Sequence, residues 1–114
     1  MVGKNVYIGP DLIVVNNSQE HEGMLVIGDR VAIAPRVTLV LGSDANWSGL
    51  NDIIPPERGP IVIGKDSWIG TGAIVLPGVE IGEFSIIGAA ALVNKNVPSR
   101  EVHAGVPAKL IRKI

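Results

Sequence analysis

The sequence of 114 residues contains no cysteine. This absence excludes a disulfide scaffold, a cysteine-ligated zinc finger and a cysteine nucleophile. Aromatic residues make up only 4% of the chain, so a core of large rings is not expected. No apolar run approaches the ~20 residues that a membrane-spanning helix needs, and the first residues do not have the pattern of a signal peptide. We therefore expect a cytoplasmic protein with no membrane partner.

The sequence also lacks an excess of charge of one sign. Ten Lys and Arg residues stand against 11 Asp and Glu residues, for a formal charge of −1, so no overall field attracts nucleic acid. Apolar residues reach 46% and charged residues only 18%, which excludes intrinsic disorder. The length predicts a single domain over residues 1–114. Its 14 Gly and 8 Pro residues favour many short strands joined by turns.

What the chain does contain is an aliphatic residue at every sixth position. Its members are Ile27, Ile33, Leu39, Ile63, Ile69, Val75, Ile81, Ile87 and Val93. Small or aliphatic residues lie two positions earlier, a spacing that puts both series on one face of short strands. Three such hexads predict one three-sided coil, and stacked coils bury a continuous aliphatic column. Gly often follows the aliphatic residue, where we expect it to adopt the positive φ of a tight corner.

The repeat is interrupted twice, over about residues 16–24 and about residues 42–60. Counting the faces predicts that both loops leave the coil at the same corner, in successive coils. Loops of more than ~12 residues inside a compact domain are usually functional or disordered. We expect a functional site where these two polar loops meet.

Outward positions on two of the three faces are apolar, Tyr7 and Trp68 on one, Ile13 and Ile74 on another. A soluble monomer rarely exposes this much apolar surface, which predicts a homotrimer in which each subunit buries two faces. The segment from about residue 98 to residue 114 is basic. It is either a solvated tip or a contact for an anionic ligand such as a nucleotide phosphate.

Two stretches resemble a known family: GPIVIGKDSWIGTGAIVLPGVEIG at residues 59–82 and AGVPAKLIR at residues 104–112. Both are similar to the hexapeptide-repeat acyltransferases, in the O-acetyltransferase branch that includes galactoside, maltose and serine acetyltransferases. The resemblance implies an all-β, left-handed parallel β-helix with a short C-terminal tail or helix. It also implies acetyl transfer from acetyl-CoA to the hydroxyl or amine of a sugar-like acceptor, without a metal. The alternative is an inactive chain that acts as a binding or scaffold subunit.

In that family CoA lies in a groove between two subunits of a trimer. The resemblance puts Trp68 beside the thioester, and Lys109 and Arg112 at the phosphates. Small residues would follow the pantetheine arm, namely Gly70, Thr71, Gly72, Gly88 and Ala89. A thin apolar arm suits residues that allow a close approach to the backbone, and phosphates suit a basic end.

The candidate catalytic residues depart from the family. Its catalytic His lies in a Ser-His-Pro-like segment, whereas this chain has Asp44 at that place, followed by Asn46. An ordinary Asp, with a pKa near 4, is a weak base for an alcohol. Three readings remain open: an amine acceptor that needs no strong base, His21 of the neighbouring loop as the base, or an inactive chain. His103 matches no catalytic position and is expected at the surface.

Overall fold

The computed structural model describes residues 1–16 and 24–114. Within these ranges the chain forms short β-strands and one 3₁₀ helix, η1 (Gly49–Asp52). The first strands are β1 (Tyr7–Ile8), β2 (Ile13–Val15), β3 (Leu25–Ile27), β4 (Ala32–Ile33), β5 (Thr38–Val40), β6 (Gly42–Ser43), β7 (Glu57–Arg58) and β8 (Ile61–Ile63). The remainder are β9 (Trp68–Ile69), β10 (Ile74–Val75), β11 (Glu80–Ile81), β12 (Ile86–Ile87), β13 (Leu92–Val93), β14 (Glu101–Ala104) and β15 (Lys109–Lys113).

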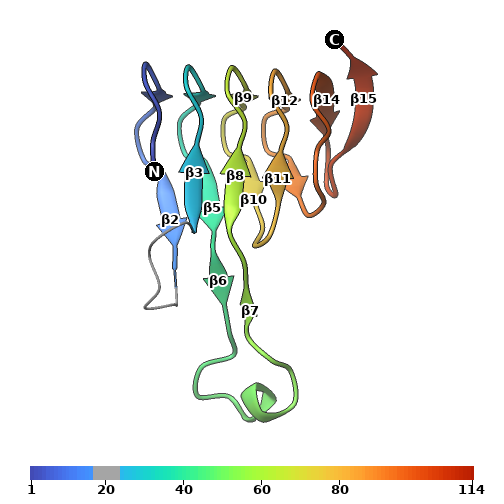
Figure 1. Cartoon of the computed structure of the whole chain (residues 1–114). Coiled ribbons are helices and arrows are strands. Elements are labelled where there is room, and N and C mark those ends of the chain that lie inside the picture. Colours follow the sequence, from blue (N-terminus) through green and yellow to red (C-terminus); the bar gives the residue numbers. More distant parts are fainter. Residues whose placement is uncertain (17–23) are drawn as a thin grey trace.

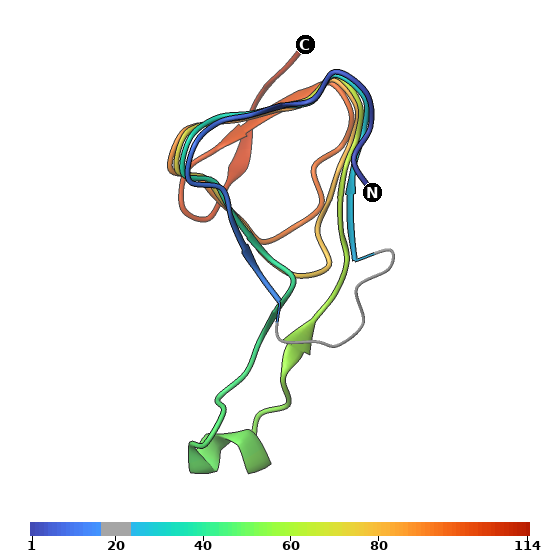
Figure 2. The same ribbon diagram turned by 90° about the vertical axis from the view of Figure 1, so that its left-hand side faces the viewer.

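Three parallel sheets form the sides of a triangular coil. The first sheet has the order β3-β8-β11, the second begins β1-β4-β9-β12, and the third is β2-β5-β10-β13. Successive coils lie side by side in Figure 1 and superpose as a triangle in Figure 2. Trp68 pairs with Ile86, which lies 18 residues further on, so one coil contains three hexads. This is the all-β, left-handed parallel β-helix that the resemblance implies.

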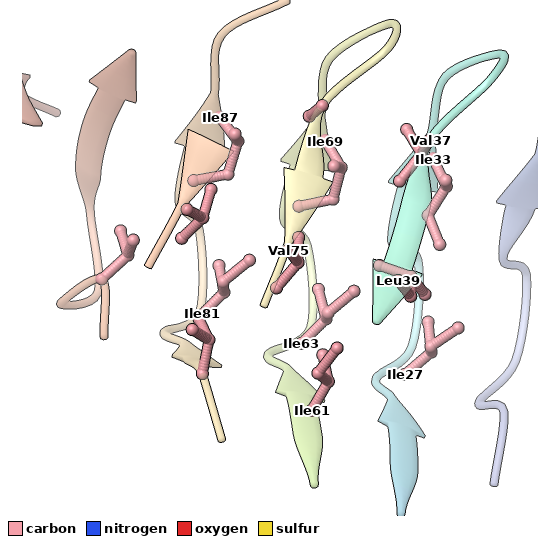
Figure 3. Packing of buried hydrophobic residues seen from close by; sticks show 14 of the residues in the cluster. Ile27, Ile33, Val37, Leu39, Ile61, Ile63, Ile69, Val75, Ile81 and Ile87 are labelled. Carbon is pink, nitrogen blue, oxygen red and sulfur yellow. The ribbon is translucent and has the colours of Figure 1, made fainter. Parts of the chain in front are cut away.

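The interior of the coil is the predicted aliphatic column. All nine members are exposed by 2% or less (Figure 3). The series two positions earlier is also buried apart from Leu25, which is partly buried, and it includes two serines. The Ser67 hydroxyl donates to the Gly82 carbonyl at 2.9 Å, and the Ser85 hydroxyl donates to the Pro98 carbonyl at 2.9 Å. The core therefore accepts these hydroxyls without leaving them unsatisfied.

The role predicted for the repeated glycines is wrong. Positive φ occurs two residues after these glycines, as at Asp66 (60°) and Phe84 (56°). A Cβ added to Gly64 would instead lie 2.6 Å from the backbone nitrogen of Glu83 in the next coil. Glycine is needed there because adjacent coils approach too closely for a side chain, not because of its conformational freedom.

The C-terminal segment also differs from the expected short tail or helix. β14 continues the second sheet beside β12, and β15 returns antiparallel along β14. This hairpin lies at the C-terminal end of the stack (Figure 1). It forms because the hexad repeat stops before it, while alternating residues on both sides of a Gly-containing turn can still pair as strands.

His103 is not the surface residue that was expected. It pairs with Ile87 and so occupies the next position of the interior column. Its Nε2 lies 2.9 Å from Oε1 of Glu101, and the two side chains are only 12% and 14% exposed. The last rung of the core on this sheet is thus a polar pair.

Two connections in successive coils span the same corner of the stack. The connections β2–β3 and β5–β8 both run from the third sheet to the first, and these strands are neighbours in both sheets. The second connection forms an arm, in which β6 and β7 make an antiparallel ribbon and η1 lies at the tip. Figures 1 and 2 show this arm extending far from the coil.

Candidate functional site

The residues expected beside the pantetheine arm gather at the corner between the second and third sheets. Residues 70–73 connect β9 to β10, and residues 88–91 connect β12 to β13 in the next coil. The backbone N–H of Ala90 donates to the carbonyl of Thr71 at 2.8 Å. The two segments are therefore in direct contact along this corner.

Side chains at this corner become small in the C-terminal half of the stack. Its positive-φ position is occupied by Asp11 and Arg36 in the first two coils, but by Gly72 and Ala90 in the next two. A Cβ on Gly72 would meet nothing within 4 Å, so this glycine keeps space open at the surface. The corner can accept a thin chain lying against the backbone.

Most of the polar backbone groups here are already used. The N–H groups of Gly70, Gly72 and Gly88 donate to neighbouring coils at 2.8, 3.0 and 2.8 Å. These glycines can shape a binding surface, but they have no N–H left to donate to a ligand.

Trp68 starts a row of residues across the second sheet. It is 55% exposed and pairs with Ile86, which pairs with Val102, which in turn lies opposite Arg112. Paired residues share one face of a sheet, so this row lies on the outer face. Three strand spacings of ~4.8 Å separate Trp68 and Arg112 by roughly 14 Å.

A β-bulge brings Lys109 to the same face as Arg112. Residues three apart point to opposite sides of a regular strand. Here the register shifts between Val102 and His103, so that Lys109 lies opposite Ala104 and Arg112 opposite Val102. Ala104 and Val102 are two apart and share the outer face, and therefore both basic residues do so as well.

The candidate catalytic residues lie on the arm. Asp44 follows β6, and its Oδ1 accepts a hydrogen bond of 2.7 Å from the backbone N–H of Asn46. Asn46 itself has a φ of 51°, which sharpens this turn. His21 lies outside the described residues.

Within one chain the arm and the small-residue corner adjoin the third sheet at different corners of the coil. The corner with residues 70–72 precedes β10, whereas the arm follows β5, the neighbour of β10. These connections are at opposite ends of parallel strands. The structure thus brings the expected cofactor residues together, and Asp44 with Asn46, but it does not unite the two groups in a single subunit.

The tip of the arm exposes large apolar side chains that sequence reasoning did not single out. Trp47 is 102% exposed, Leu50 56%, Ile53 73% and Ile54 58%. The sequence feature that could have indicated them is a cluster of large apolar residues in a segment without the hexad repeat. Such residues cannot pack into the interior of the coil.

Other features lie away from these residues. A hollow of about 550 Å³ on the first sheet is lined by residues such as Val26, Val62 and Lys65. None of these three was predicted as a catalytic or CoA-binding residue. Across residues 1–16 and 24–114, no helix is long and apolar enough to span a bilayer. In the same ranges no three His, Asp or Glu residues gather in a way that could hold a metal ion.

Stacked hexads, small corner residues and a long arm define a hexapeptide-repeat β-helix protein. Residues 60–95 match the family model described as bacterial transferase hexapeptide (six repeats). These residues carry the bacterial transferase hexapeptide repeat, as the resemblance implied.

Relatives with known names agree with this assignment. Galactoside O-acetyltransferase of Escherichia coli (strain K12) is 38% identical over 113 residues, which cover 99% of this chain and 53% of the relative. A hexapeptide-repeat acetyltransferase of Vibrio cholerae, solved with acetyl coenzyme A, has a TM-score of 0.83 and 28% identity, over 98% of this chain and 58% of that chain. A maltose O-acetyltransferase from Clostridium difficile has a TM-score of 0.72 and 31% identity, over 96% and 59%. This chain spans about half the length of such relatives.

Proposed function

We propose that this protein transfers an acetyl group from acetyl-CoA to the hydroxyl or amine of a sugar-like acceptor. The observation that carries this proposal is the row from Trp68 to Arg112, which runs beside a corner of small residues and ends in basic side chains. Relatives named for galactoside and maltose support the acceptor class, and the Vibrio cholerae complex with acetyl coenzyme A supports the donor. Such a donor is an intracellular metabolite, which is why we expect the protein in the cytoplasm.

The donor would lie along this row with its thioester next to Trp68. Its pantetheine arm would follow residues 70–72 and 88–89, where small side chains permit close approach. Lys109 and Arg112 would bind the phosphates by charge-assisted hydrogen bonds.

A homotrimer would complete the site. Because the arm and the small-residue corner lie at opposite ends of the third sheet, we infer that the arm of one subunit approaches the corner of its neighbour. Such a head-to-tail contact closes into a ring. It would also cover apolar side chains that the single chain exposes, among them Tyr7 (58%), Ile13 (53%) and Trp47 (102%).

In the reaction, the acceptor oxygen or nitrogen attacks the thioester carbonyl and the C–S bond breaks. The departing CoA sulfur takes up the proton that the acceptor loses, so that CoA leaves as the thiol. With an amine acceptor, the neutral amine is the nucleophile, and Asp44 orients it and receives its proton after attack. With a hydroxyl acceptor, a base must take the proton during attack, and we propose His21 for that task because the ordinary pKa of a histidine suits it.

The decisive experiment measures release of the CoA thiol from acetyl-CoA with a panel of amino and hydroxy sugars. We expect turnover with at least one acceptor and measurable CoA binding by calorimetry. CoA binding without turnover on any acceptor would favour the alternative, an inactive binding or scaffold subunit. No CoA affinity even in the millimolar range would refute the proposal.

A further inference from the structure

Two titratable side chains occupy inward positions at the end of the coil. His103 continues the interior position of Ile33, Ile69 and Ile87, and Glu101 lies two residues earlier on the same side of β14. Aliphatic residues and two serines, Ser67 and Ser85, occupy these positions in earlier coils. An apolar pair would serve burial at least as well as an ion pair. Burial alone therefore does not explain why a polar pair, with a contact of 2.9 Å between Glu101 and His103, occupies these positions.

The position of this pair coincides with the β-bulge. The register of β14 and β15 shifts between Val102 and His103, the segment that the Glu101–His103 contact spans. A bulge disrupts the ladder locally and leaves one residue unpaired, so the strands need another constraint at that point. The Glu101–His103 contact lies within β14 and constrains the backbone of that strand on the inner face, directly behind Val102.

We propose that Glu101 and His103 act as a positioning pair for the phosphate-binding strand. The contact fixes the bulged register, and the bulge keeps Lys109 and Arg112 together on the outer face. Without it, β15 can return to a regular register in which these two residues point to opposite sides. This inference rests on the proposed function, because it assumes that the two basic residues bind the phosphates of CoA.

The test compares a donor that has the nucleotide phosphates with one that lacks them. Dissociation constants for CoA and KM values for acetyl-CoA and acetyl-pantetheine are measured for Glu101→Ala, Glu101→Gln and the wild type. We expect Glu101→Ala to weaken CoA binding about tenfold, the order expected for loss of one hydrogen bond to a charged group. The KM for acetyl-pantetheine should not change. Glu101→Gln retains an oxygen acceptor for His103 and should bind CoA within about twofold of the wild type.

Glu80→Ala is the matched control, because it removes one carboxylate from the exposed surface of the first sheet. It should leave both donors unaffected. If Glu101→Ala does not fold, Glu101→Leu removes the same contact while filling the buried space.

Equal weakening toward both donors, or no weakening of CoA, would overturn the positioning role while the proposed function stands. A wild-type protein that binds no CoA would overturn the proposed function and this inference with it.

Discussion

At the scale of single residues, glycines that follow aliphatic positions of the column are constrained by contact between coils. The backbone of the next coil lies where a Cβ would be, 2.6 Å away for Gly64, whereas nothing lies within 4 Å of a Cβ on Gly49 in the arm. Gly64 follows β8 and Gly49 begins η1, but only Gly64 lies against the backbone of another coil.

We therefore expect Gly64→Ala to destabilise the protein and Gly49→Ala to have little effect. Overpacking of a tight contact costs about 1–3 kcal/mol or more, whereas an unstrained surface change stays within about 0.5 kcal/mol. Urea unfolding at one fixed protein concentration measures both. Equal stability of the two variants would contradict the close-contact explanation.

Asp44 allows a second prediction at this scale. Asp44→Asn keeps an oxygen that can accept from the Asn46 N–H, but it removes the negative charge. Under the amine scheme, which we favour, this variant lowers turnover with amino sugars, whereas His21→Ala leaves it nearly unchanged. Asp52→Asn, on the same arm, controls for loss of charge. A drop of about 10²–10⁴ for His21→Ala would instead indicate a hydroxyl acceptor with His21 as the base.

At the scale of elements, residues in equivalent places of successive coils form a ladder along the corner between the first and second sheets. Its positive-φ members are Asn5, Arg30, Asp66, Phe84 and Arg100. Arg30 donates to Asp66 through Nε at 2.8 Å and Nη2 at 3.0 Å. One coil further on, the Arg100 guanidinium lies 4.7 Å from the centre of the Phe84 ring. These contacts favour one register between coils, because a slip of one residue would break them.

The Arg30–Asp66 pair makes acid stability testable. The hydrogen bonds from Arg30 lower the pKa of the Asp66 carboxyl in the folded protein. The pair thus stabilises the fold above the ordinary Asp pKa, and this contribution disappears as the pH falls through the lowered pKa.

Arg30→Ala should return the pKa of Asp66 toward its ordinary value. The Asp66 carboxyl carbon would then titrate at higher pH in NMR spectra, whereas Arg36→Ala should leave its titration in place. The difference should shrink in high salt, because the Arg30 side chain is 52% exposed. An unchanged Asp66 titration in Arg30→Ala would show that the ion pair does not form in solution.

The elements also show which features of the fold and of the candidate site could be predicted from the sequence. Ile33 and Ile69 were predictable as core residues because a strict period of six allows only one inward face. The shared face of Lys109 and Arg112 was not predictable, since it depends on a one-residue register shift in a segment without the repeat. The burial of His103 was not predictable for the same reason. It lies in the segment without the repeat, where no spacing marks it as a member of the column.

At the scale of the whole molecule, two separate apolar surfaces are exposed to solvent in the single chain. One includes Tyr7 and Trp68 on the second sheet, and the other is the tip of the arm around Trp47 and Ile53. A chain that cannot cover either surface by itself is expected to associate.

We expect sedimentation equilibrium to give three copies of the 12.0 kDa chain, about 36 kDa, at micromolar concentration. Trp47→Ser combined with Ile53→Ser should shift the population toward monomer, since it removes apolar area from the arm. Ile114→Ser, an exposed residue at the far end of the stack, is the control. A wild-type protein that sediments as a monomer would remove the basis for a site shared between subunits.

The coil turns the corner from the third sheet to the first in two very different ways. Residues 41–60 make that passage between β5 and β8, whereas residues 76–79 suffice between β10 and β11. The excess residues add no rung to the stack, and closing a longer loop costs only ~0.6 kcal/mol for each doubling of its length. Under the proposed function, this segment contacts the acceptor, while the donor lies against the coil. Descendants of such a protein could therefore replace the arm wholesale and acquire new acceptors, while the rest of the chain inherits folding and donor binding unchanged.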